Sequence, residues 1–276
     1  MNMRGVDNVL LYVHIGDSNQ GGPVAKPGGW DTKYDTSNMY VYYKDNRTSA
    51  DDGLWRLYSD IAAPYVSRYP GVQAVAGNVG PDQAFIYALD QDTTVKRKKR
   101  YIKVAVGGST LLTKSGADND WNPATSVEIF NAFTIYFTRL GLSKLPAENL
   151  RNPQFAGVVV RLGTNDCATG AFNQANFTAA VPAFCTALRA TLGPVPIYWV
   201  QIRSDLGSAS GFDATSVSQA RTILSNCQSG GSTPISGFTL LNYDSDTVQA
   251  DGVHFDAPSF LRQGAEEAAA LIALGG

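Results

Sequence analysis

The sequence predicts an α/β protein with an open, mainly parallel sheet wrapped by helices. Two observations predict this class. Short apolar segments alternate with longer amphipathic ones along the chain, and the apolar segments are rich in Val, Ile and Leu. Such runs are typical of strands buried on both faces of a parallel sheet. The chain of 276 residues is 44% hydrophobic and 17% charged, which supplies a large core and excludes a disordered chain. We expect one domain, residues 1–276.

Strands are expected where apolar residues run almost without interruption, at Val9–Ile15, Tyr101–Val106, Phe155–Leu162, Val195–Ile202 and Phe238–Asn242. Helices are expected in the longer segments between and after them, at Gln83–Leu89, Ser126–Leu140, Asn173–Leu192, Ala214–Asn226 and Pro258–Leu274. The last helix has the strongest local signals. Its residues are mostly helix formers, Pro258 falls in the first turn and Asp256 can cap the start.

Residues 19–70 do not follow this alternation. They contain Gly, Pro, Asn, Asp, Trp and Tyr with no steady period, so we expect a long loop or small insertion. Because this region follows the first strand, it should lie at the carboxyl edge of the sheet, where open α/β sheets bind ligands. The basic run at 95–100 is expected as a solvated loop before a strand rather than as a patch for an anionic partner.

The balance of acidic and basic residues limits the classes of binding partner that we expect. With 22 basic and 24 acidic residues, the net charge of −2 gives no overall field that attracts nucleic acid or an anionic membrane. No apolar run approaches the roughly 18–20 residues that span a bilayer. No export signal is visible, but one trimmed from a longer precursor would leave no trace, so a secreted or particle-associated origin stays open. The three cysteines cannot all pair within one chain, and the oligomeric state stays open too.

Histidine is scarce, which narrows the choice of a general base. A base that titrates near neutrality is His14, His254 or a carboxylate with a raised pKa. His14 lies in the first predicted strand, about 13 Å from Ser18 if the chain is extended, and is expected as a packed or supporting residue. His254 follows Asp251 by three residues on a turn with Gly252. That carboxylate can fold back onto Nδ1 and leave Nε2 to accept a proton.

Polar segments follow three of the predicted strands. Gly16-Asp17-Ser18 places a hydroxyl on a tight turn after the first, where a helix N-cap is the alternative interpretation. Residues 106–109 (VGGS) follow the second, and residues 162–166 (LGTND) follow the third. A glycine N–H, an asparagine amide and the N–H of the nucleophile are suitable donors to the oxyanion of an acyl-transfer reaction. Together with DGVH at 251–254, these segments indicate such a site.

The order GDS, GGS, GTND, DGVH resembles the SGNH (GDSL-like) hydrolase superfamily, whose four blocks contribute Ser, Gly, Asn and His. The resemblance extends over nearly the whole chain. It implies a flavodoxin-like three-layer α/β/α sandwich with a mainly parallel central sheet, and hydrolysis of an ester without a metal or organic cofactor. By motif position it implies a Ser18, His254 and Asp251 triad, with oxyanion donors from Ser18, Asn165 and Gly107, which the motif alignment favours over Gly108.

Further segments are similar to the carbohydrate acetylesterase and sialate O-acetylesterase-like branch: GDSNQGG, NVGPDQAF at Asn78–Phe85, and VGGSTLL followed by Trp121. Asp17 and GTND instead follow the wider superfamily, since that branch often has Gln and a QGE-type third block. The resemblance implies a small-molecule or carbohydrate ester as substrate, with a short acyl group, acetyl above all. Trp30, Trp121 and Gly108 are the expected substrate contacts, although aromatic residues often fill hydrophobic gaps instead.

Other interpretations remain open. A thioesterase or lysophospholipase of the same superfamily would use the same residues, and a carbohydrate-binding module could keep the motif without turnover. Cys167 is a rival nucleophile with no partner motif, and a small packed thiol is the simpler interpretation. Arg203 can either hold an anionic group of the substrate or pair with Asp205.

Overall fold

The computed structural model describes residues 8–35, 39–43, 54–57, 78–113, 120–125, 129–134 and 151–275. Within them, seven strands form one sheet: β1 Asn8–Gly16, β3 Tyr40–Tyr43, β4 Leu54–Leu57, β6 Lys98–Ala105, β7 Arg151–Arg161, β8 Ile197–Val200 and β9 Phe238–Leu241. Their order is β4-β3-β6-β1-β7-β8-β9. All neighbours are parallel except the antiparallel pair β3–β4 at one edge.

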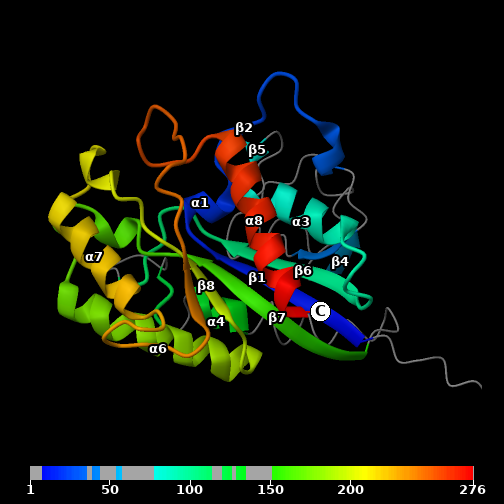
Figure 1. Ribbon diagram of the computed structural model, residues 1–276. Helices are drawn as coiled ribbons and strands as arrows, with labels where there is room; N and C mark the ends of the chain where they lie inside the picture. The colour runs from blue at the N-terminus through cyan, green and yellow to red at the C-terminus, as the bar shows by residue number, and fades with distance from the viewer. Residues whose placement is uncertain are drawn as a thin grey trace, which may run out of the picture.

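Helices cover both faces of the sheet (Figure 1). The principal ones are α3 Pro81–Gln91, α6 Gln174–Leu192, α7 Ala214–Asn226 and α8 Ala257–Gly275. Side chains of α3 and α8 pack against one face, and those of α6 and α7 pack against the other. The structure therefore confirms the predicted α/β/α sandwich with a mainly parallel sheet.

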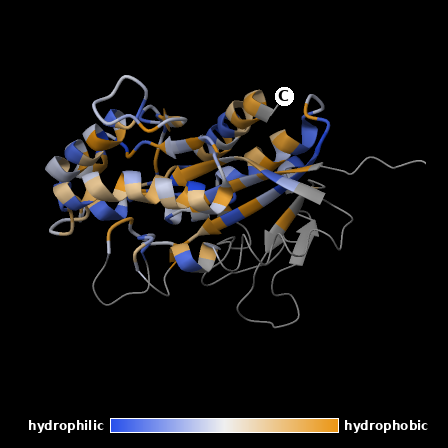
Figure 2. Ribbon diagram, turned by 90° about the horizontal axis from the view of Figure 1, so that it is seen from below, coloured by the Kyte–Doolittle hydropathy of each residue, from blue (hydrophilic) through white to orange (hydrophobic). Residues whose placement is uncertain are grey.

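The central strand β1 shows why both faces are covered. Its alternate residues Val9, Leu11, Val13 and Ile15 belong to the core under α6 and α7, whereas Leu10 and Tyr12 belong to the core under α3 and α8. Successive side chains of a strand point to opposite faces, so a continuous apolar run needs a cover on each side. Figure 2 shows apolar residues along the strands and on the helices that pack against them.

The predicted elements are largely confirmed. Helix α7 has the predicted bounds, while β8 is shorter than predicted and β7 is longer. Helix α8 starts one residue before Pro258, and the carboxylate of Asp256 accepts the N–H of Ser259 at 2.9 Å, as a helix cap does. Of the helix expected at 126–140, the described part holds α4 Ile129–Ala132, and most of the remainder lies outside the described residues.

The described part of the region at 19–70 holds more regular structure than the expected long loop. Its described residues form α1 Ser18–Gly21, β2 Val24–Ala25, a 3-10 turn η1 at Thr32–Asp35, β3 and β4. Strand β2 pairs with β5 Asn78–Val79, and β3 extends the main sheet beside β6. The sequence Tyr-Val-Tyr-Tyr of β3 has high strand propensity, and pairing covers the edge that β6 would otherwise expose.

The basic run at 95–100 is only partly a loop. Strand β6 begins at Lys98, so the expectation of a solvated loop is wrong for the second half of the run. The ammonium of Lys99 lies 2.7 Å from a carboxylate oxygen of Asp92, and both side chains are largely buried. Pairing within the fold therefore satisfies part of this charge. No helix in the described parts of the chain is both long and apolar enough to cross a membrane.

Candidate active site

The carboxyl ends of β1, β6 and β7 bring the polar motifs together. Strand β1 ends at Gly16, and α1 begins two residues later with Asp17 as its cap, whose Oδ1 accepts the N–H of Asn19 at 2.9 Å. Ser18 is thus the first residue of a short helix. Glycine is required at position 16, because a Cβ there would lie 2.6 Å from the carbonyl oxygen of Arg161 on the neighbouring strand.

The hydroxyl of Ser18 lies within hydrogen-bond distance of the imidazole of His254, although the two residues are 236 positions apart in the sequence. The Ser18 Oγ to His254 Nε2 distance is 2.8 Å, and the His254 Nδ1 to Asp251 Oδ2 distance is 2.6 Å. Figure 1 shows α1 beside the loop that joins β9 to α8, which carries both partners. The three side chains form one continuous hydrogen-bonded chain.

Local hydrogen bonds hold Asp251 in place. Its Oδ1 accepts the N–H groups of Val253 and His254 at 2.9 and 3.0 Å, and Gly252 between them has a φ of +70°. Partial burial raises the pKa of Asp251, but the hydrogen bonds from the backbone and ring of His254 and from the backbone of Val253 lower it more in total. The net pKa lies below its ordinary value, so the carboxylate stays ionised beside the imidazole.

The three predicted oxyanion donors, Ser18, Gly107 and Asn165, follow the carboxyl ends of β1, β6 and β7. The amide of Asn165 donates to the carbonyl oxygen of Ser109 at 2.9 Å, which uses one of its two N–H bonds. The N–H groups of Ser18 and Gly107 have no hydrogen-bond acceptor among the described residues. Gly107 is half-buried, whereas Gly108 is exposed with a φ of +76°.

Asp166, which the sequence analysis did not single out, connects two of these segments. Its oxygens accept the N–H groups of Leu111 and Leu112, both at 2.8 Å, and its side chain is almost fully buried. The loop after β6 is thereby fixed to the turn that carries Asn165. Burial raises the pKa of Asp166 to about 7, although the two backbone N–H groups lower it. The sequence signal that could have identified Asp166 is its place directly after Asn165 in the GTND segment.

No protein-family model and no curated protein matches the sequence. Solved structures do match over almost the whole chain. A protein from Arabidopsis thaliana matches with a TM-score of 0.65 and 14% identity, over 96% of this chain and 98% of that one. Two carbohydrate acetylesterases also match: one from Xanthomonas citri (TM-score 0.58, 15% identity, 96% and 57% of the two chains) and Est24 from Sinorhizobium meliloti (0.53, 12%, 96% and 99%).

The chain has the fold of the SGNH hydrolases. In this SGNH fold, the four motif segments lie at one edge of the sheet. The contact between Ser18 and His254 can pass a proton from a hydroxyl to an imidazole, which is one requirement of acyl transfer.

The structure corrects one expected substrate contact. Trp121 is completely buried, packs against Phe133 and Phe184, and donates from Nε1 to the hydroxyl of Ser109 at 3.1 Å. It therefore supports the glycine loop of the SGNH fold from within the core and cannot stack on a sugar. Trp30 is half-buried, with its ring 5.6 Å from that of Tyr34, so a role in substrate contact remains a prediction.

The rival nucleophile Cys167 is inaccessible. Its side chain is fully buried, and burial, together with nearby Asp166 and Asp213, raises its pKa to about 12. A buried neutral thiol is unreactive. All three cysteines are free and buried. Among the described residues, no group of three or more His, Cys, Asp or Glu side chains could hold a metal ion.

His14 lies beneath α1 in a buried network, as a packed strand residue. The Gln20 side chain receives a hydrogen bond from Arg161 Nε at 3.1 Å and lies 2.9 Å from His14 Nδ1. Because the Gln20 oxygen accepts from Arg161, its amide nitrogen donates to Nδ1, which requires neutral His14. Burial keeps the His14 pKa well below its ordinary value, as do the nearby cations Arg161 and Lys103. Arg161 also pairs with the buried Glu267.

Proposed function

We propose that this chain is a serine esterase that hydrolyses short-chain acyl esters, acetyl esters of a carbohydrate in particular. The observation that carries the proposal is the continuous contact from Ser18 Oγ through the ring of His254 to Asp251, at 2.8 and 2.6 Å. This is the geometry that activates a serine hydroxyl in acyl transfer. The proposed unit is a single domain spanning the chain.

The proposed reaction has two halves. Ser18 Oγ attacks the ester carbonyl carbon while His254 Nε2 takes the hydroxyl proton, and the carbonyl oxygen becomes an oxyanion near the N–H groups of Ser18 and Gly107 and the amide of Asn165. Collapse of this intermediate breaks the bond to the alcohol, which leaves with the proton from His254. Water then attacks the acyl-enzyme, gives a proton to His254, and the acid is released as Ser18 recovers its proton.

Asp251 has a supporting role in this scheme. As an ionised acceptor at Nδ1, it places the Nδ1 proton toward itself and leaves Nε2 free to accept the proton of Ser18. It also stabilises the imidazolium that forms in each half of the reaction. Apart from the substrate and the attacking water, every group in the scheme comes from the chain.

Two observations support an acetylated carbohydrate as the substrate. Two of the similar structures are carbohydrate acetylesterases, and the segments GDSNQGG and VGGSTLL resemble that branch. The described residues include only one large hydrophobic side chain that is well exposed, Leu274 near the end of α8. An extended apolar surface for a long acyl chain is thus not evident in the described part of the molecule.

Hydrolysis of 4-nitrophenyl esters tests the proposal. We expect release of 4-nitrophenol from the acetate, and loss of that activity in Ser18→Ala with the fold retained by circular dichroism. Ser218→Ala, an exposed serine on α7, is the matched control. Equal rates for Ser18→Ala and the parent would refute the mechanism. No turnover by the parent would favour a binding module, and a maximum at eight or more acyl carbons would favour a thioesterase or lysophospholipase.

A further inference from the structure

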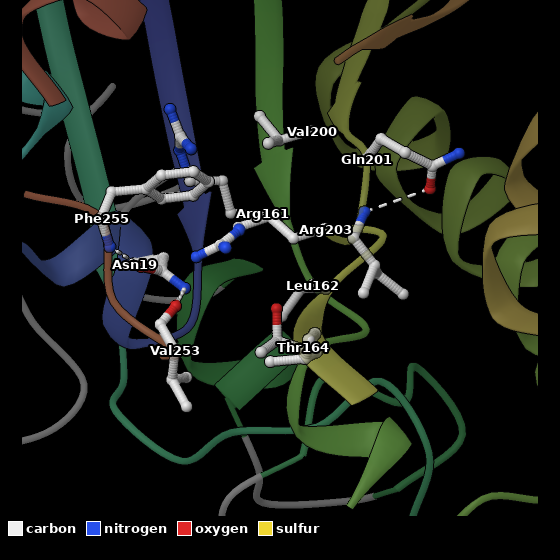
Figure 3. Close-up of a pocket in the computed structure, with 11 residues that line it drawn as sticks. Asn19, Arg161, Leu162, Thr164, Val200, Gln201, Arg203, Val253 and Phe255 are labelled. Atoms are coloured by element: carbon white, nitrogen blue, oxygen red, sulfur yellow. Dashed lines mark hydrogen bonds between the residues drawn. The ribbon is translucent and has the colours of Figure 1, made fainter. Parts of the chain in front are cut away.

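A small pocket is lined in part by residues that adjoin Ser18 and His254 in the sequence (Figure 3). Three of its lining residues are Asn19, Thr164 and Val253, which directly follow or precede Ser18, Asn165 and His254 in the sequence. Neighbouring Cα atoms are about 3.8 Å apart, so the backbone that lines this pocket is continuous with the backbone that carries Ser18, Asn165 and His254. The cavity volume of about 20 Å³ has room for one or two water-sized groups, such as an oxygen of a carboxylate that enters from outside.

Arg203 extends into this pocket from the loop after β8. Figure 3 shows its side chain crossing toward Phe255 and Asn19, and its Cζ lies 5.5 Å from the centre of the Phe255 ring. Only 6% of the residue is exposed. Its Nη2 pairs with Asp205, but its buried Nε and Nη1 have no hydrogen-bond partner in the described part of the chain. Buried donors without acceptors are costly, and the cost is greatest for a charged group.

The charge of the other arginine in the pocket, Arg161, is compensated differently. The guanidinium of Arg161 pairs with the completely buried carboxylate of Glu267, and only its Nη1 has no hydrogen-bond partner in the described part of the chain. The partner of Arg203 is instead Asp205, whose side chain is 58% exposed to solvent. The described residues that line the pocket include two arginines and no carboxylate. The pocket is therefore suited to a small group that is negatively charged and accepts hydrogen bonds.

We propose that Arg203 binds a carboxylate of the ester substrate, so that the enzyme acts on acidic esters. This inference rests on the proposed esterase function. A planar guanidinium matches a carboxylate in shape and hydrogen-bonding pattern, and the pair is strong where water is excluded. The carboxylate belongs either to the alcohol half, as in an acetylated sugar acid, or to the acyl half, as in the half-ester of a dicarboxylic acid. Asp205 occupies one side of the guanidinium, and the substrate occupies another.

Two pairs of substrates test the proposal and distinguish the two halves. The first pair is an O-acetylated methyl hexuronoside and the corresponding O-acetylated methyl hexoside. The second is the 4-nitrophenyl monoester of glutaric acid and 4-nitrophenyl pentanoate. In one pair we expect kcat/KM to be at least about tenfold higher for the acidic member. The methyl ester of the hexuronoside removes the charge without changing the protein and should behave like the neutral sugar if the alcohol half carries the carboxylate.

Variants assign the preference to Arg203. Arg203→Gln should reduce the acidic-to-neutral ratio of kcat/KM to about one, and Arg203→Lys should keep part of the preference. The control Arg97→Gln changes an exposed arginine just before the amino end of β6 and should keep all of it. Acidic-to-neutral ratios near one in both substrate pairs would overturn this inference. This result is measured on the parent chain and does not depend on whether a variant folds. A ratio that Arg203→Gln leaves unchanged would also overturn it. Turnover of 4-nitrophenyl acetate without an acidic preference leaves the proposed esterase intact, whereas absence of all turnover overturns both proposals.

Discussion

Asn19 holds the backbone on both sides of His254. Its Nδ2 donates to the carbonyl oxygen of Val253 at 3.3 Å, and its Oδ1 accepts the N–H of Phe255 at 3.4 Å. Asn19 directly follows Ser18 and is itself buried. One side chain thus connects the turn that carries the hydroxyl to the loop that carries the imidazole, and fixes the approach of the two groups.

Asn19→Ala should therefore lower kcat more than it changes KM. Loss of two long hydrogen bonds costs about 1 kcal/mol of stability, but it also frees the His254 loop, and we expect kcat for 4-nitrophenyl acetate to fall about tenfold. Steady-state kinetics with thermal unfolding as a check on the fold measure both effects. Asn176→Ala, at an exposed position of α6, is the control. An unchanged kcat would show that Asn19 is not needed for positioning.

Asp251→Asn should reduce kcat/KM by about a hundredfold or more. An amide at this position can turn its N–H groups toward Nδ1, which would place the ring proton on Nε2 and block it as a base. Asp31→Asn, a change at an exposed carboxylate paired with Lys33, should have no such effect. Rates for 4-nitrophenyl acetate decide the matter, and near-parental activity in Asp251→Asn would remove Asp251 from the triad.

Gly16→Ala should destabilise the fold by about 1–3 kcal/mol and reduce activity, because the added Cβ would lie 2.6 Å from a backbone oxygen of β7 that cannot move independently. Gly28→Ala is the matched control, since an added Cβ there meets nothing within 4 Å. Chemical denaturation of both variants provides the comparison. Similar stabilities would mean that the ends of β1 and β7 are less closely packed than the structure shows.

Asp166 should make the protein less stable as pH rises. Burial raises its pKa from 3.8 to about 7, so the folded state binds more protons than the unfolded state between these values. The free energy of unfolding then decreases with rising pH across this window. Other groups titrate in the same range, so the test is the difference between the parent and Asp166→Asn in denaturation at pH 4.5 and 7.5. A parent that loses no more stability than the variant over this interval would contradict the prediction.

The sequence by itself determined the elements and the local half of the site. Apolar runs such as that of β1 predict buried parallel strands because a strand covered on both faces needs apolar residues at every position. Asp251 and His254 lie three residues apart on a glycine turn, so their contact is a matter of local geometry. The sequence also indicates that the polar segments after the strands share one edge of the sheet, because the carboxyl ends of parallel strands lie at the same edge.

Only the tertiary structure decided the rest. The Ser18–His254 contact joins groups 236 residues apart, and its distance depends on the packing of β1, α1 and the loop before α8. Trp121 resembles a sugar-stacking residue in sequence but is buried in the core. The unpaired donors of Arg203 could not be predicted either. The physical reason is the same in each case, because burial and long-range distances arise from how separate elements pack, and no local pattern of residues encodes them.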